Sequence, residues 1–209
     1  CGLVVGYRGD DLPDGRSSWS CHQFLMPWFK GFSLRPNINL IAGHMWVPID
    51  DENCLLWSFE YVPDRPLSDP ALGWSANSLN AETIPASERT VRNRDNDYLI
   101  DRKLQSSGRS FTGITGVGQQ DSAIQESMGP ILDRGREHLG PADISIITLR
   151  RILQRALKDL ETGAPIQGFD SRAQHLRSVA IELPAGVSFV DAGYAELKER
   201  SGMLAAAAA

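Results

Sequence analysis

Several short stretches near the start of the chain are rich in apolar residues and are predicted to be extended. Residues 3–7, 19–26, 40–47 and 54–62 have this extended pattern. In the last of these stretches the apolar residues fall at every second position, at Leu55, Trp57, Phe59 and Tyr61, which is typical of a strand with one buried face. A polar loop at 48–53 joins the third stretch to the fourth and predicts a hairpin. This part of the chain therefore predicts an antiparallel sheet.

Residues 63–110 follow neither the strand period nor the helix period. Pro, Asn, Ser, Asp and Arg dominate this stretch, and an irregular loop of such length is uncommon inside a compact domain. It can serve as a lid, a binding loop or a subunit contact. It can equally be a solvated excursion with a few short helical turns, and the sequence leaves both interpretations open.

Two helices are predicted after this stretch. Residues 119–128 place four side chains on one helical face, and Gly129-Pro130 ends that helix; the four are Asp121, Ile124, Gln125 and Met128. The second helix carries a continuous apolar stripe made of Leu149, Ile152, Leu153, Ala156, Leu157 and Leu160. We expect Asp143 to cap its start and Gly163 its end.

A last strand, at residues 179–183, is expected to return to the sheet. Strands come first, helices follow, and the chain shows no strand–helix–strand alternation. The predicted fold class is therefore α+β, an antiparallel sheet with a long packed C-terminal helix. We expect residues 1–204 to belong to one domain, and the alanine tract at 205–209 to carry no information.

Composition and charge narrow the function classes. Lys and Arg number 21 against 26 Asp and Glu, which gives a net charge of −5, whereas a nucleic-acid binder would show a basic excess. No apolar run in the sequence approaches the ~20 residues that cross a bilayer. Neither nucleic acid nor a membrane is therefore an expected partner. Three separated cysteines, Cys1, Cys21 and Cys54, predict reduced thiols and a cytoplasmic location.

Asp121 is the leading candidate for chemistry. It shares its predicted face with Ile124 and Met128, so a carboxylate would stand on the face that meets the core. Burying an unpaired carboxylate is costly, and a cap, an arginine, a proton or a metal ion must compensate. The local sequence favours an N-cap, with Ser122 as the first helical residue, and leaves a metal ligand as the alternative.

Other polar residues favour structural roles. Four potential acid–base groups lie near Arg134 and Arg136, which is typical of solvated or ion-paired side chains; they are Glu126, Asp133, Glu137 and His138. His22 and His44 lie in predicted strands, where two histidines can bind a metal but a lone histidine is more often satisfied by a backbone partner. The segment 113–118 contains three glycines, but it lacks the glycine spacing and the lysine of a phosphate-binding loop.

Residues 118–151 resemble a known family. The run GQQDSAIQESMGPI at 118–131 is followed by Asp133-Arg134, EHLG at 137–140, Asp143 and Arg150-Arg151. This stretch is similar to the C-terminal part of the oxygenase component of Rieske non-haem iron oxygenases, in the subgroup of phthalate dioxygenase and dehydrodivanillate O-demethylase. QFLMP at 23–27 and WVPIDDE at 46–52 resemble sheet strands of the same catalytic domain. The resemblance covers roughly residues 2–160.

The resemblance implies a helix-grip, START-like catalytic domain that is incomplete on its N-terminal side. It implies that Asp121 is the carboxylate of a mononuclear Fe(II) site, a 2-His-1-carboxylate triad that activates O2 beside an aromatic substrate. The reaction would be dihydroxylation, hydroxylation or oxidative O-demethylation. Electrons would pass from NAD(P)H through a reductase and a [2Fe–2S] Rieske cluster, and the enzyme would be a trimer.

Further residues receive expected roles from the same resemblance. Gln120 and Gln125 would position Asp121, although solvent-facing or capping roles account for them equally well. An apolar substrate pocket would be lined by the 63–110 stretch and by four sheet residues, which core packing explains equally well: Phe24, Met26, Trp28 and Phe29.

The chain also departs from the family pattern. It contains no H-x(3–5)-H pair for the two iron-ligating histidines, and the adjacent Cys21-His22 does not have the Rieske ligand spacing. The chain also starts without an initiator Met, so we expect a piece of a longer protein that is inactive alone. Two alternatives stay open: a non-catalytic helix-grip module that binds an apolar small molecule, and a different metal enzyme that uses His22, His44 and Asp121.

Overall fold

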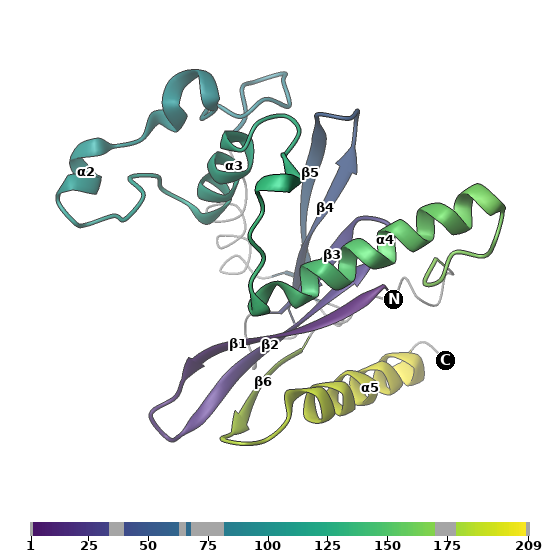
Figure 1. Ribbon diagram of the computed structural model, residues 1–209. Helices are drawn as coiled ribbons and strands as arrows, with labels where there is room; N and C mark the ends of the chain where they lie inside the picture. Colours follow the sequence, from purple (N-terminus) through teal and green to yellow (C-terminus); the bar gives the residue numbers. More distant parts are fainter. Residues whose placement is uncertain (1, 34–39, 63–65, 68–81, 170–178, 208–209) are drawn as a thin grey trace. The chain divides into compact units, whose positions relative to one another are not determined.

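The computed structural model of the chain (Figure 1) describes residues 2–33, 40–62, 66–67, 82–169 and 179–207. The chain divides into two compact units. The first comprises Cys1–Trp46, Phe59–Arg65 and His138–Ala209, and the second comprises Val47–Ser58 and Pro66–Glu137. Among the described residues, no helix is both long enough and apolar enough to span a membrane.

The described strands form one six-stranded sheet in the order β1-β2-β3-β4-β5, with β6 paired to β2. The pairs β1–β2, β2–β3, β2–β6 and β3–β4 are all antiparallel. The strands are β1 (Leu3–Asp11), β2 (Arg16–Leu25), β3 (Phe29–Phe32), β4 (Ile41–Pro48), β5 (Cys54–Tyr61) and β6 (Val179–Pro184). The predicted α+β class is therefore confirmed.

Strand β2 organises this sheet because it pairs along both of its edges. One edge pairs with β1, from Leu3 opposite Phe24 to Asp11 opposite Ser17. The other edge is shared, since residues 16–21 pair with β6 and residues 23–25 pair with β3. A late segment of the chain thus returns next to an early one, as the predicted strand at 179–183 requires.

The best-buried cluster of the first unit lies where β2 and β6 meet a helix. Cys21 and Val179 are fully buried, and Leu197 of α5 (Phe189–Ala207) packs against them. Trp19 and Phe189 stack with ring centroids 4.8 Å apart. Figure 1 shows α5 running beside β6, at the yellow end of the chain. Sequence analysis predicted neither α5 nor the four-residue strand β3.

The two predicted helices are present as α3 (Val117–Ser127) and α4 (Ile144–Thr162). Gly163 ends α4 in the left-handed conformation, with φ +71°, as predicted. Asp143 stands at the N-cap position of α4, but its side chain makes no capping hydrogen bond there. Its carboxylate instead accepts a hydrogen bond from the backbone N–H of Gly140, at 2.8 Å.

The apolar stripe of α4 is less buried than its pattern predicted. No residue of α4 is fully buried, and its C-terminal half carries Leu157 and Leu160 with 61% and 64% of their surface exposed. The N-terminal part of the stripe, at Leu149, Ile152, Leu153 and Ala156, is half-buried. The helix forms because its residues favour helix, and it ends where Gly163 adopts the left-handed conformation.

The described part of the irregular stretch contains only short elements. They are an isolated bridge between Thr83 and Thr90, a 3-10 helix η1 (Arg94–Leu99) and the short helix α2 (Arg102–Ser106). Residues 63–65 and 68–81 of that stretch lie outside the described residues. Two more 3-10 turns, η2 (Arg134–Arg136) and η3 (Pro141–Asp143), precede α4.

Gly43 lies where β4 packs closely against β3. A Cβ atom built on Gly43 would lie 2.2 Å from the carbonyl oxygen of Lys30 and 2.5 Å from the ring of Phe59. Because the first of these atoms belongs to the backbone, Gly43→Ala should lower the free energy of unfolding by about 1–3 kcal/mol, as measured by urea denaturation. Gly140→Ala is the control, since its Cβ would meet only Asp143, at 3.9 Å. Equal stability of the two variants would contradict this packing.

Candidate functional site

Asp121 lies in the middle of α3 with its side chain exposed to solvent. The helix begins after Gly116, which adopts φ +90°, a conformation that favours glycine. The Gln120 side-chain amide donates a hydrogen bond to the carbonyl of Ile114 at 3.0 Å. Gln120 therefore fastens the preceding loop to the helix, which is a structural role.

The structure corrects two expectations about Asp121. It is not an N-cap, because Gly116 occupies that position and the helix has already begun at Val117. Its face is not buried either, since Ile124 and Met128 have 62% and 50% of their surface exposed. Among the described residues no hydrogen bond or ion pair involves the Asp121 carboxylate. Both of its oxygens are therefore available to bind another group.

The opposite face of α3 packs inward. Gln119 and Ala123, one turn apart, are the buried residues of the helix. Ala123 forms a buried cluster with Tyr98 and Ile114, and Ile100 packs against it. Sequence analysis missed Tyr98, because it lies in an aperiodic stretch and only a contact distant in sequence buries it. Helix α3 thus presents a polar carboxylate on one side and a small apolar residue on the other.

His22 and His44 belong to a row of rings on one face of the sheet. The ring centroids of Tyr7 and His22 are 4.3 Å apart, those of His22 and Phe32 are 5.2 Å apart, and those of Phe32 and His44 are 5.9 Å apart. The row continues to Trp46. Phe32 therefore contacts both imidazoles and lies in the row between them. Within the described residues no group of three metal-ligating side chains comes together. His22 and His44 belong to the first unit and Asp121 to the second.

His22 is held as a neutral imidazole. Its Nε2 lies 2.9 Å from the Ser20 hydroxyl, while its buried Nδ1 has no hydrogen-bond partner in the described part of the chain. Burial, the larger cause, and the positive charge of Lys30 together lower the pKa of His22 to about 4. Cys21, next in the strand, is kept as a thiol because burial raises its pKa to about 11. The thiol is therefore a packing group and not a nucleophile.

The remaining candidates also take structural positions. The Asp133 carboxylate accepts a hydrogen bond from the backbone N–H of Gly135, at 3.0 Å, and so caps η2. Glu137 forms an ion pair with Arg134. These two carboxylates confirm the predicted structural roles. Of the residues expected to line an apolar pocket, Met26 is buried, and three are half-buried: Phe24, Trp28 and Phe29.

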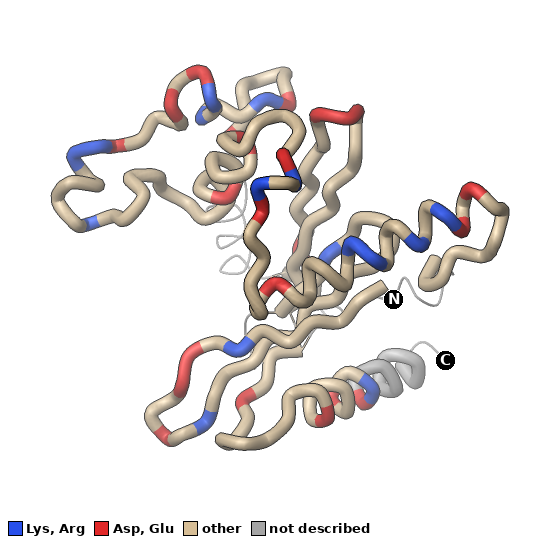
Figure 2. The backbone as a smooth tube through the Cα atoms, in the orientation of Figure 1, with Lys and Arg blue, Asp and Glu red and all other residues tan. Residues whose placement is uncertain are grey.

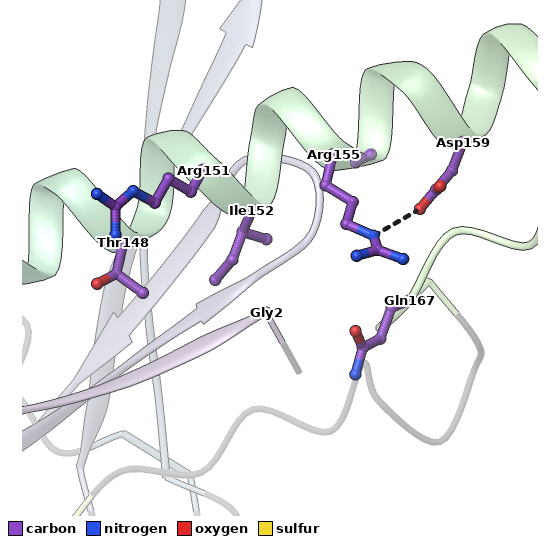
Figure 3. A pocket seen from close by; sticks show the side chains of 8 residues that line it. Gly2, Thr148, Arg151, Ile152, Arg155, Asp159 and Gln167 are labelled. Carbon is purple, nitrogen blue, oxygen red and sulfur yellow. Dashed lines mark ion pairs between the residues drawn. The ribbon is translucent and has the colours of Figure 1, made fainter.

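A groove of about 320 Å³ runs along α4 (Figure 3). Ile152 and Ala156 provide apolar surface, while Arg151 and Arg155 contribute guanidinium groups. Arg155 Nε lies 3.9 Å from an Asp159 carboxylate oxygen, a long contact that leaves much of its charge uncompensated. Figure 2 shows basic residues spaced along this helix. The lining therefore combines apolar surface with groups of both charges, since Asp159 also lines the groove.

The described residues do not form a complete iron site. A facial triad needs two histidines and one carboxylate that converge on one point. The part of the chain that the structure describes contains no group of three potential ligands. The Asp121 carboxylate is exposed and is carried by a regular helix.

Comparisons with known proteins agree with the resemblance seen in the sequence. Residues 25–182 match the family model described as "LigXa C-terminal domain like". The chain is 33% identical over 165 residues to a 3-chlorobenzoate-3,4-dioxygenase oxygenase subunit of Comamonas testosteroni, over 73% of this chain and 38% of that protein. It is 31% identical over 140 residues to a phthalate 4,5-dioxygenase oxygenase subunit of Pseudomonas putida, over 66% of this chain and 31% of that protein. The chain spans about a third of the length of these curated relatives.

The neutral state of His22 predicts a pH dependence of stability. The unfolded imidazole binds a proton near its ordinary pKa of 6.5, whereas the folded one does so only near 4. Stability should therefore be full above pH 6.5 and fall as the pH drops toward 4, by about 3 kcal/mol at most and less if solvent screens the ring. His22→Phe should flatten this slope in urea titrations at several pH values, and His138→Gln should not. Equal slopes for wild type and His22→Phe would contradict the burial of a neutral ring.

Proposed function

This chain belongs to the LigXa C-terminal domain-like family, and we propose that it forms the C-terminal part of the catalytic domain in a Rieske-type terminal oxygenase. The observation that supports this most is the similarity, across most of the chain, to two proteins named as oxygenase subunits. The same names favour an enzyme over a non-catalytic binding module. The exposed carboxylate of Asp121 is consistent with it.

The complete enzyme would act on an aromatic compound. Ferrous iron, when bound, supplies the activation of O2 that dihydroxylation, hydroxylation or O-demethylation requires. The two relatives are named for 3-chlorobenzoate and phthalate, which are aromatic carboxylates, and we extend that substrate class to this protein. Electrons would come from NAD(P)H through a reductase partner and a [2Fe–2S] Rieske cluster carried outside this chain.

Asp121 would hold the metal in that enzyme. An ionised carboxylate completes a 2-His-1-carboxylate triad and offsets one positive charge of the ion. Asp121 lies in the middle of the α3 sequence, so a regular helix fixes the backbone that carries its carboxylate. The exposed Ile124 and Met128 beside it give the same face apolar surface, which a part of the protein carrying the two histidines could cover. The chain's own contribution to the site is thus one ligand and the surface around it.

The assembly and location of the enzyme follow from the same proposal. We place the complete oxygenase in the cytoplasm as a trimer. Cys21 and Cys54, the free cysteines of the described residues, form no disulfide there, which is consistent with a reducing compartment.

Replacing Asp121 tests the ligand directly. Asp121→Asn in the complete oxygenase should reduce Fe(II) affinity by at least about 10–100-fold, the range that even outer-shell changes produce. The fold should be retained, because an exposed substitution in a helix usually changes stability by less than about 0.5 kcal/mol. Metal analysis after gel filtration and circular dichroism measure the two effects. Asp133→Asn is the matched control and should keep its iron, whereas full iron occupancy in Asp121→Ala would refute the assignment.

The 209-residue chain alone should neither retain iron nor turn over substrate. One carboxylate is a poor Fe(II) site, because metal affinity depends on the number and geometry of the ligands. The measurement is iron content after incubation with ferrous salt under anaerobic conditions and passage through a desalting column. The Asp121→Ala form of the same chain gives the background. Stoichiometric iron above that background would show that this chain contains a complete site.

A further inference from the structure

The backbone before α2 is held in an unfavourable conformation. Asp97, Tyr98 and Leu99 have φ values of +50°, +53° and +48°, three consecutive left-handed residues that carry side chains. Side chains disfavour this region because Cβ approaches the following carbonyl oxygen. Such conformations persist only where the surroundings enforce them, and they gather at functional positions.

A dense set of hydrogen bonds enforces this conformation. The guanidinium of Arg92 donates to the carbonyl oxygens of Tyr98 and Leu99, at 3.3 and 3.1 Å. Asn93 and Asn96 form a capping box at the start of η1. Asp97 pairs with Arg102 at 2.9 Å. The polar side chains of this segment therefore act together to fix its backbone.

The segment buries one side chain, that of Tyr98. Its exposed fraction is 8%, whereas the neighbouring Leu99 is 50% exposed. The Tyr98 ring packs in a cluster with Ala123 of α3 and Ile114. Its hydroxyl is buried and has no hydrogen-bond partner among the residues that the structure describes. The contact with α3 is therefore made by the aromatic ring and not by a hydrogen bond.

Tyr98 and Asp121 lie on opposite sides of the same helix. Ala123, which the ring contacts, is two residues after Asp121, and two residues correspond to about 200° around an α-helix. The ring thus packs against α3 on the side of the helix that faces away from the Asp121 carboxylate.

We propose that Tyr98 is a positioning residue. Its ring, held in place by the strained backbone, fixes the position of α3 and thereby the position of the Asp121 carboxylate that would bind the metal. This inference rests on the proposed function, since it requires Asp121 to be a ligand. The ring carries the effect and the hydroxyl does not. Tyr98→Phe should therefore behave as wild type, and variants without the ring should not.

The first test uses the 209-residue chain and needs no metal. In Tyr98→Ala, amide hydrogen exchange should become at least about tenfold faster in α3, while β2 and β6 keep their protection. Tyr98→Phe should exchange as wild type. Leu99→Ala is the matched control, because it alters the next left-handed residue but removes an exposed side chain. Unchanged exchange in the α3 of Tyr98→Ala would overturn the proposal.

The second test measures iron in the complete oxygenase. Tyr98→Ala should release Fe(II) to a chelator at least about tenfold faster than wild type, and Tyr98→Phe should restore the wild-type rate. If the alanine variant does not fold, Tyr98→Leu replaces it, because leucine fills part of the space that the ring occupied. Tyr98→Leu should also release iron faster than wild type. Wild-type release from the folded alanine or leucine variant, or fast release from Tyr98→Phe, would overturn the proposal.

Asp121→Asn separates this inference from the proposed function. If Asp121→Asn loses iron and Tyr98→Ala keeps it, the ligand assignment stands and the role of Tyr98 is refuted. If Asp121→Asn keeps its iron, the ligand assignment fails and the role of Tyr98 fails with it.

Discussion

Hydrogen bonding along both edges of β2 is the constraint on which the rest of the sheet depends. One strand serves β1 on one side and both β3 and β6 on the other. This pairing fixes the register, and the register decides which side chains share a face. Cys21 consequently meets Val179 and the residues of α5, while its neighbour His22 joins the row of rings on the opposite face. The buried core and the neutral histidine are therefore two results of the same register.

In the second unit, one face of α3 is buried and the other is exposed. Its inner face carries Ala123 against Tyr98, and its outer face carries Asp121 with exposed apolar neighbours. The support is costly, because each left-handed residue with a side chain is unfavourable by on the order of 1–2 kcal/mol. The hydrogen bonds of Arg92 and the burial of the Tyr98 ring must offset that cost. A carboxylate on a well-supported helix is the arrangement that a metal site requires.

Sequence patterns predicted those elements whose signal is local. The strand period revealed β5, and the apolar stripe together with Gly163 revealed α4 and its end. Strand β3 escaped prediction because four residues are too short to show a period, and α5 escaped because its apolar residues follow no clear helical stripe. For Asp121 the local pattern favoured a cap, which was wrong, since the positive φ of Gly116 starts the helix one turn earlier. The burial of Tyr98 depends on contacts distant in sequence that no local pattern encodes.

We propose above that the Asp121 carboxylate binds iron. Anomalous X-ray diffraction at the iron edge, from crystals of the complete oxygenase, tests this most directly. We expect an iron peak bonded to a carboxylate oxygen of Asp121 and to two histidines from outside this chain's residues. An iron peak whose protein ligands do not include Asp121 would contradict it.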